Sequence, residues 1–404
     1  MENEIMERPF DNFKTAIDDP DYFFGHGALI NAVQQSPFLV RVLLGGRRIG
    51  KTSALRAIEW NLLDSNSGKP CRAFPVFISF KSEQPKDLDN LRYIMIARLR
   101  EAIERWQQVP GTALRETYRR FRRQVASAEV TIGFLKALGA KFSITNPDRE
   151  RQLIHEDFRQ ALLRTIKELE KLNFEGICFL FDDAEFIVRK DWANDAWSYF
   201  RSLKDTDTAL KSFFGLVLSG YRDLQNYHQE VGSPLFNIAQ VEWLLPLDDS
   251  EIKKLVTHRS KLEKVALSEE KSNFVVDWAG GHPYLTQQIL NAICASCHTQ
   301  KESVSAENLV SNLIQQHSNQ FSKWWNLNQH PDGFIETERL VYQVLVEHRQ
   351  GTCESLAKLA RLSELEVADA LMMLVGTGVI KKLDEENYAI GTRLFEKWVE
   401  QQKR

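Results

Sequence analysis

The chain has 404 residues, of which 43% are hydrophobic and 26% are charged, and its formal net charge is only −3. The length indicates two or three domains, and the near-neutral charge gives no global reason to expect a nucleic-acid or membrane partner. The N-terminal residues lack the apolar segment of a secretory signal, and no run approaches the roughly 18 apolar residues of a transmembrane helix. The 5 cysteines are too sparse for a disulfide framework, so we expect a cytoplasmic protein.

The first motif in the chain lies between an expected strand and an expected helix. Ser36–Leu44 is mostly apolar, as in a buried parallel strand, and the residues after Lys51 follow helical periodicity. Glycines in the intervening turn let several backbone N–H groups point at phosphate oxygens, and a helix N-terminus adds partial positive charge. Lys51 is then expected to reach the β- and γ-phosphates, and the Thr52 hydroxyl to ligate Mg²⁺. The candidate phosphate loop comprises Gly45, Gly46, Arg47, Arg48, Ile49, Gly50, Lys51, Thr52 and Ser53.

A second expected strand is followed by an arginine-rich insertion. Pro75 lies within this strand, Cys71–Phe80, and predicts that it has an exposed or bulged start. The insertion is expected to be helical and to span about 92–150. Between Arg92 and Arg123 it has nine arginines and three glutamates. This cluster is either a solvated helix face or a docking surface for an acidic partner or nucleic acid.

Acidic residues follow the third expected strand. The helix Leu153–Leu172 leads to the apolar run Ile177–Phe181, which ends in Asp182 and Asp183. A Mg·ATP site needs a carboxylate at the C-terminal end of a strand beside the phosphate loop, and Asp182 suits that role. Asp183 is the candidate to orient or activate the attacking water, with Glu185 as the second candidate.

Two further strands complete the expected sheet. Phe213–Leu218 is followed by Ser219, whose side chain can meet a γ-phosphate, and Arg222 is a second candidate phosphate sensor. Val241–Leu247 is the fifth apolar run. Five apolar strands alternating with helices predict a doubly wound parallel α/β sheet, and ligands of such sheets bind at the carboxyl ends of the strands.

The chain after the sheet carries only helical signals until about residue 330. Gly280 and Gly281 separate two of these helices. Cys294, Cys297 and His298 match the pattern for covalent haem attachment, but the residues around them fall at helical spacing and the chain lacks an export signal. We interpret this motif as a packed helix end, and the whole segment as a helical lid.

A turn-rich linker, Asn328–Phe334, leads to a C-terminal segment with the pattern helix, helix, helix and hairpin. This order predicts a winged-helix domain. Its third helix carries Glu364, Glu366 and Asp369 and no basic residue, so it would repel DNA phosphates. The expected domains are 1–248 for the nucleotide-binding α/β domain, 249–330 for the lid and 334–404 for the winged helix.

Several of these motifs together resemble one family. The segments GGRRIGKTSAL, FLFDDAEF, LVLSGYRDL and GGHPYLTQQIL are similar to those of the STAND and archaeal-type ATPases, relatives of AAA+ proteins and origin-recognition ATPases. The resemblance runs from about Phe24 to the C-terminus. It implies a P-loop NTPase sheet of the AAA+ or STAND type, a helical lid, and a winged-helix domain that folds back on the nucleotide domain. It also implies ATP or ADP and Mg²⁺ as ligands.

The resemblance assigns residues to the nucleoside side of the site as well. Phe24 and Gly25 match the family's adenine-side motif, although His26 stands where arginine is usual. That departure leaves open any contact that depends on the arginine. Pro283 matches the lid proline that packs against the nucleotide in this family.

Two features of the phosphate side are left open by the resemblance. The family often carries arginines at the positions of Arg47 and Arg48, which either contact lid or partner groups over the γ-phosphate or form a solvated loop face. No residue matches the winged-helix histidine that touches the β-phosphate in the family. How nucleotide would be sensed in a closed arrangement is therefore not predicted.

The favoured function is an ATP-binding, slowly hydrolysing molecular switch. It would control or assemble with an effector or regulatory protein in a signalling or defence-type system, and would form nucleotide-dependent homo-oligomers. The alternative is a DNA-associated ATPase of the origin-recognition or transposition-regulator type, which the near-neutral charge and the acidic third helix disfavour. A third class, a nucleotide-binding scaffold without turnover, stays open because Asp183 is one methylene shorter than the usual catalytic glutamate.

Overall fold

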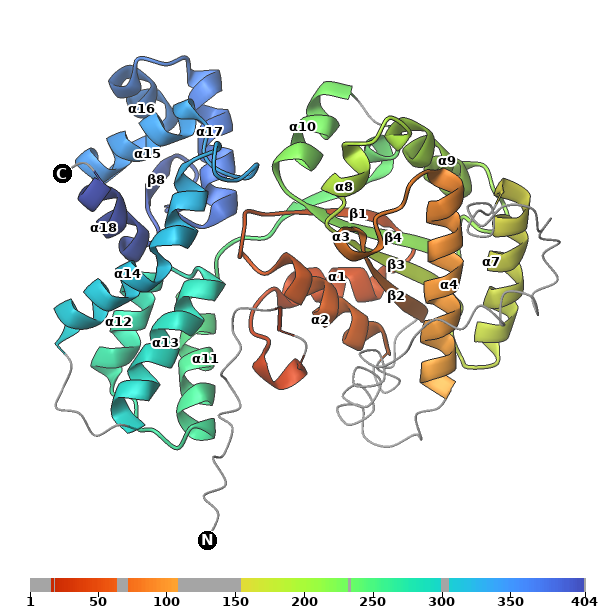
Figure 1. Cartoon of the computed structure of the whole chain (residues 1–404), viewed down its shortest axis with the longest axis horizontal. Helices are drawn as coiled ribbons and strands as arrows, with labels where there is room; N and C mark the ends of the chain where they lie inside the picture. The colour runs from red at the N-terminus through yellow and green to blue at the C-terminus, as the bar shows by residue number, and fades with distance from the viewer. Residues whose placement is uncertain are drawn as a thin grey trace, which may run out of the picture.

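The computed structural model describes residues 16–17, 19–63, 72–107, 154–231, 234–298 and 305–402. These residues form an α/β part and a helical part, which lie side by side in Figure 1. The α/β part, coloured red to green, is on the right of that view, and the helical part, coloured teal to blue, is on the left.

Five parallel strands form the sheet of the α/β part in the order β2-β3-β4-β1-β5. Every residue of the three inner strands is buried, because helices cover the sheet on both faces and leave no solvated side for alternating polar residues. The doubly wound parallel sheet predicted from the apolar runs is thus confirmed. The strands are β1 (Val40–Leu44), β2 (Ala73–Ser79), β3 (Gly176–Asp182), β4 (Phe214–Gly220) and β5 (Gln240–Trp243).

The prediction for Pro75 was wrong in detail. Pro75 is buried, and it pairs with Cys178 in an unbroken register from Ala73 to Ser79, so the strand has neither an exposed start nor a bulge. The proline is tolerated because β2 is an edge strand, which needs only part of its backbone N–H groups for pairing.

Helices connect the strands and pack on the sheet. Among them α2 contacts β2, β3 and β4, α4 contacts β2, and α7 contacts β3. The expected helix at 153–172 is present as α7. The helices of this part are α1 (Gly27–Gln35), α2 (Lys51–Leu63), α3 (Phe80–Glu83), α4 (Leu88–Gln107), α7 (His155–Glu170), α8 (Glu185–Val188), α9 (Ala193–Asp205) and α10 (Arg222–Val231), with short 3-10 turns at Pro20–Tyr22 and Phe236–Ile238.

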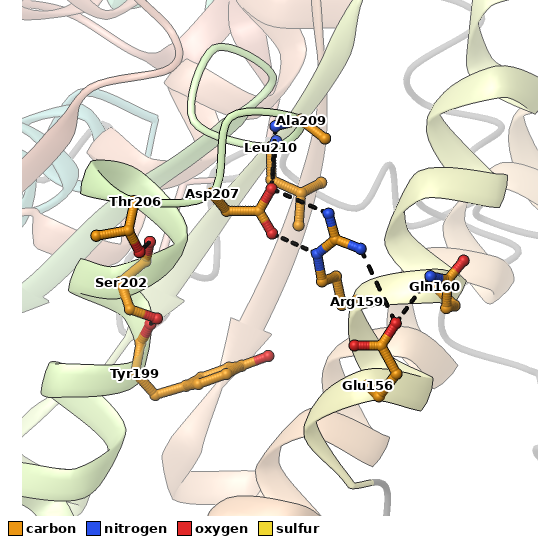
Figure 2. A network of polar contacts seen from close by, with 9 residues as sticks. All are labelled: Glu156, Arg159, Gln160, Tyr199, Ser202, Thr206, Asp207, Ala209 and Leu210. Carbon is orange, nitrogen blue, oxygen red and sulfur yellow. Dashed lines mark hydrogen bonds and ion pairs between the residues drawn. The ribbon is translucent and has the colours of Figure 1, made fainter.

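An ion pair fixes α7 to the turn that follows α9 (Figure 2). The Arg159 Nε donates to Asp207 at 2.6 Å, while the other carboxylate oxygen of Asp207 accepts the backbone N–H groups of Ala209 and Leu210 at 3.0 and 3.2 Å. Burial alone would raise the pKa of Asp207, but the bonds from Arg159 and the backbone lower it below its usual value. This turn leads directly into β4, so the network helps to set the start of a central strand.

The arginine-rich cluster is described in part, because residues 108–153 lie outside the described residues. Its first four arginines lie on α4, and all four are paired with carboxylates. Arg92 pairs with Asp89 and lies over the Tyr199 ring, at 3.9 Å from the ring centroid. The other three are Arg98 with Glu83 and Glu101, Arg100 with Glu168, and Arg105 with Glu101. Acids of the chain itself therefore hold these four arginines.

The helical part begins with four helices in the segment predicted as a lid. Local sequence sets their ends: Asp248 and Glu251 form a capping box, Ser268 and Ser305 cap the next N-termini, and Gly280 ends a helix in the left-handed conformation. The Cys294 motif forms the C-terminal end of a helix, as interpreted from its spacing, with Cys294 buried, Cys297 half-buried and His298 exposed. The helices are α11 (Asp249–Leu262), α12 (Glu269–Ala279), α13 (Pro283–His298) and α14 (Ala306–Trp325).

The C-terminal segment contains three helices followed by a hairpin, in the order expected, together with two elements that were not expected. The first is β6, which completes a three-stranded antiparallel sheet in the order β6-β8-β7, and the second is a closing helix, α18. Glu366 caps the N-terminus of the third helix with Ser363. The elements are α15 (Glu336–His348), β6 (Gln350–Thr352), α16 (Cys353–Ala360), α17 (Glu364–Thr377), β7 (Ile380–Lys382), β8 (Asn387–Ile390) and α18 (Arg393–Gln402).

Two hydrophobic cores hold the described chain together. The first runs from Leu29 to Leu244 and belongs to the α/β part. The second runs from Leu247 to Val399, so the four lid helices and the C-terminal segment share it. Across the described ranges, no helix combines the length and the apolar character needed to cross a membrane.

Candidate nucleotide-binding site

The candidate phosphate loop connects β1 to α2. Gly50 has a φ of +106°, and a Cβ placed on it would meet nothing within 4 Å, so the loop opens onto empty space at the helix N-terminus. The Nζ of Lys51 donates to the Gly45 carbonyl at 2.6 Å and to the Gly46 carbonyl at 3.1 Å. The lysine therefore spans the hollow of its own loop, which is where a phosphate would replace the two carbonyls as its partner.

Polar residues from the first turn of α2 and from the end of β4 meet at Asp182, the last residue of β3. One carboxylate oxygen accepts the Thr52 hydroxyl at 2.8 Å, and the other accepts the Ser219 hydroxyl at 2.6 Å. A hydroxyl and a carboxylate placed together at a phosphate loop fit Mg²⁺, whose other ligands would be water and phosphate oxygens. Thr52 and Asp182 are the protein ligands that this chemistry would use.

Asp183 and Glu185 both line the cavity beside the loop. Asp183 is in the left-handed conformation, with a φ of +56°, and accepts a long hydrogen bond from the Ser79 hydroxyl at 3.5 Å. Burial and the adjacent Asp182 charge raise the pKa of Asp183. Glu185 accepts the backbone N–H of Tyr221, and burial raises its pKa to about 7. Glu185 is therefore suited to proton transfer near neutral pH, and the pKa of Asp183 is shifted in the same direction.

Replacing Glu185 by glutamine is expected to remove part of the pH dependence of stability. Because burial raises the pKa of Glu185 from 4.5 to about 7, folding favours its protonated form. The resulting stabilisation is complete below the lower value and is lost as pH rises through the higher one, by about 2 kcal/mol after screening by water. Denaturant unfolding at about pH 5 and about pH 8 measures this loss. Wild type should lose more than E185Q, and an identical loss in both would contradict the pKa assignment.

The cavity has a volume of about 690 Å³ and two ends of different character. Phe24, Tyr22, Leu255 and Pro283 line one end, which suits a nucleoside. Charged residues line the other end: Arg47, Lys51, Lys81, Asp183, Glu185, Arg189 and Asp332. Thr52, Ser53, Arg48 and Gly50 also line the cavity, so most of the predicted site residues are brought together here.

Several predicted residues lie behind the cavity wall instead. Gly45, Gly46 and Gly25 each lie where a side chain would collide with neighbouring atoms, so they allow close packing of the backbone. The Ile49 side chain is fully buried in the first core. Ser219 is buried, and its hydroxyl donates to Asp182, the candidate Mg²⁺ ligand. His26, at the position where the resembling family usually has arginine, has its pKa lowered to about 4 by burial. It is therefore neutral near pH 7 and supplies no charge to a nucleotide.

The assignment of Arg222 to a phosphate does not agree with the structure. Both terminal nitrogens of Arg222 donate to Glu338 at 2.8 Å, and one also donates to the Gly333 carbonyl at 3.2 Å. Arg222 and Glu338 are buried together. The guanidinium therefore fixes α15 and the preceding linker to the end of β4, and Arg222 is not among the residues that line the cavity.

The two loop arginines contact the helical part, which was one of the two predicted alternatives. Arg47 bonds to the His330 ring, and the Arg48 guanidinium lies 5.0 Å from the centre of the Tyr284 ring. Neither forms a solvated loop face. His330 and Asp332 were missed from the sequence, since the linker that contains them was identified only by its turn-forming composition.

No protein-family model matches the chain, and no curated protein matches it. Solved structures do match it. The Walker-type ATPase PABY2304 of Pyrococcus abyssi shares 13% identity over 96% of this chain and 98% of its own, with a TM-score of 0.54. This chain has the fold of a P-loop ATPase.

Looser similarities extend over comparable lengths. The ORC1 protein of Aeropyrum pernix, solved in complex with DNA, has 12% identity over 95% of this chain and 94% of its own, with a TM-score of 0.41. The RuvB Holliday junction branch migration motor of Thermotoga maritima has 11% identity over 96% and 99%, with a TM-score of 0.38. At these scores the two similarities carry no argument about this chain.

Proposed function

We propose that the protein is an ATP-binding, slowly hydrolysing molecular switch that controls a partner protein. The observation that carries this proposal is the composition of the cavity wall. Lys51 belongs to the α/β part, Pro283 to the lid and Asp332 to the linker before α15. A ligand can change an equilibrium between arrangements only through different contacts in each, and a nucleotide in this cavity would contact all three parts.

The proposed roles follow the contacts. Lys51 would hold the β- and γ-phosphates, Thr52 and Asp182 would hold Mg²⁺, and Asp183 would position the attacking water with Glu185 beside it. The magnesium ion would neutralise phosphate charge. We assign the nucleotide-binding domain to residues 1–248, the lid to 249–330 and a winged helix to 334–404.

The C-terminal segment is proposed to act as a STAND-type winged helix that closes on the phosphate loop. Its third helix, α17, supports this role, because the Gly46 N–H donates to the Gly376 carbonyl at 2.7 Å. A Cβ on Gly46 would come within 2.6 Å of the Thr377 backbone, so only glycine allows α17 to approach this closely. The phosphate loop and the C-terminal segment are thus in direct contact.

The alternative, a DNA-associated ATPase, fits the fold equally well. The described surface gives it no support, since α17 carries Glu364, Glu366 and Asp369, and the described arginines of α4 are paired internally. A DNA-binding titration at several salt concentrations separates the two functions. Micromolar or tighter affinity that falls steeply with salt would favour the DNA-associated ATPase.

Hydrogen exchange tests the switch directly. An ATP analogue, but not ADP, is expected to raise exchange in residues 336–402 by loosening the contact between α17 and the phosphate loop. In the Asp183→Asn variant, ATP itself should have the same effect, because hydrolysis is blocked while the metal ligand Asp182 remains. Identical protection with ADP and the analogue, in the presence and absence of host-cell partners, would mean that the protein is not a nucleotide switch.

A further inference from the structure

The linker between the lid and α15 forms part of the charged end of the cavity. His330, Pro331 and Asp332 all line it. Backbone bonds fix the linker: the Gly333 N–H donates to the His330 carbonyl, and the Phe334 N–H donates to the Trp324 carbonyl, each at 2.8 Å. Together with the bond from Arg222 to Gly333, these contacts hold the linker in one position over the phosphate loop.

Asp332 brings a carboxylate into this end of the cavity from outside the α/β part. Its carboxylate lies 3.5 Å from the Nδ1 of His330, whose other ring nitrogen contacts Arg47. The charge of Asp332 acts to raise the pKa values of Arg47, Arg222 and Glu185. It therefore lies within electrostatic reach of both the phosphate loop and Glu185.

The position of Asp332 affects whether the site favours a nucleotide with two phosphates or one with three. Lys51 marks the β- and γ-phosphate side of the site, and Glu185, which feels the charge of Asp332, lies on that same side. A γ-phosphate would bring further negative charge toward this carboxylate, while a diphosphate would end short of it. Repulsion between like charges in a partly buried site lowers the affinity for the ligand by roughly a factor of ten.

We propose that Asp332 is a specificity-determining residue, which makes the closed arrangement select a nucleoside diphosphate over a triphosphate. This inference rests on the proposed function, since it requires nucleotide in the cavity. It answers how nucleotide is sensed in a closed arrangement, which the sequence did not predict. The carboxylate that discriminates against the γ-phosphate comes from the linker, and it lies at the site only when the helical part is closed.

The test compares nucleotide affinities of full-length variants by calorimetry with Mg²⁺. Asp332→Asn should tighten binding of a non-hydrolysable ATP analogue by about tenfold and change ADP affinity less than about twofold. Asp332→Glu keeps the charge and should keep the wild-type ratio of the two affinities. Glu336→Gln, which removes an exposed carboxylate four positions away, is the matched control and should change neither affinity.

The possible outcomes separate this inference from the proposed function. If wild type binds neither nucleotide, the proposed function fails. If wild type binds both but the ratio of affinities is the same in D332N, the role of Asp332 is wrong and the ATP site stands. A D332N variant that weakens both nucleotides equally would show that Asp332 only supports the linker, which also overturns the inference.

Discussion

Replacing Lys51 by alanine is expected to weaken Mg·ATP binding by about 100-fold or more. The Nζ of Lys51 is the cation that spans the phosphate loop, where it now bonds to the Gly45 and Gly46 carbonyls. Alanine removes both its charge and its reach, while the backbone N–H groups of the loop remain. Isothermal titration calorimetry with a non-hydrolysable analogue measures the change.

A matched control makes this result specific. Lys171 is exposed just after the end of α7 and is not among the residues that line the cavity. Lys171→Ala removes the same charge from the protein. Its ATP affinity should equal that of wild type. If K51A also retained wild-type affinity, nucleotide would not be bound at this loop, and the proposed function would have to be abandoned.

Replacing Arg222 by methionine is expected to lower the free energy of unfolding by about 3 kcal/mol or more. The substitution leaves Glu338, which is only 1% exposed, buried without the cation that now donates to it twice. The double variant R222M/E338Q removes the buried charge as well and should recover part of the loss. The free energies come from denaturant titrations of each variant.

An exposed pair of the same kind serves as the control. Arg201 pairs with Asp205 on the surface of α9, with both side chains about 40% exposed (40% and 39%). Arg201→Met should therefore cost no more than about 0.5 kcal/mol. Equal losses in R222M and in the double variant would contradict the view that an uncompensated buried carboxylate causes the destabilisation.

Local motifs were enough to predict one half of the site. The phosphate loop and Asp182 each follow a mostly apolar run that forms a strand. Parallel strands bring their carboxyl ends to one edge of a sheet. The contact between Thr52 and Asp182, which are 130 positions apart, could therefore be predicted from the sheet. The order of the strands did not follow from the apolar runs, because an apolar run predicts that a strand is buried but does not say which strands are its neighbours.

The other half depends on how the helical part docks. Arg222 looked like a phosphate ligand because it follows a strand end, yet its partner Glu338 is 116 positions away. The linker residues His330 and Asp332 carry no local signal beyond turn formation. Likewise, the arginines of α4 looked like a charged surface until the acids of neighbouring elements were placed beside them. Contacts of this kind arise from tertiary packing, which residue spacing does not encode.

The shared core of the lid and the C-terminal segment has a mechanical consequence. The connection from β5 to α11 carries the chain from the first core to the second. Leu244 is bonded to β1 through the Leu44 carbonyl at 2.7 Å, and Leu247 is bonded to the lid through the Gly281 carbonyl at 2.9 Å. Only Leu245 and Pro246 lie between these two anchors. If the helical part moved as one body relative to the α/β part, it would turn about these two residues. A small displacement near Pro283 would then become a larger one at α16 and β7, where a partner protein could bind.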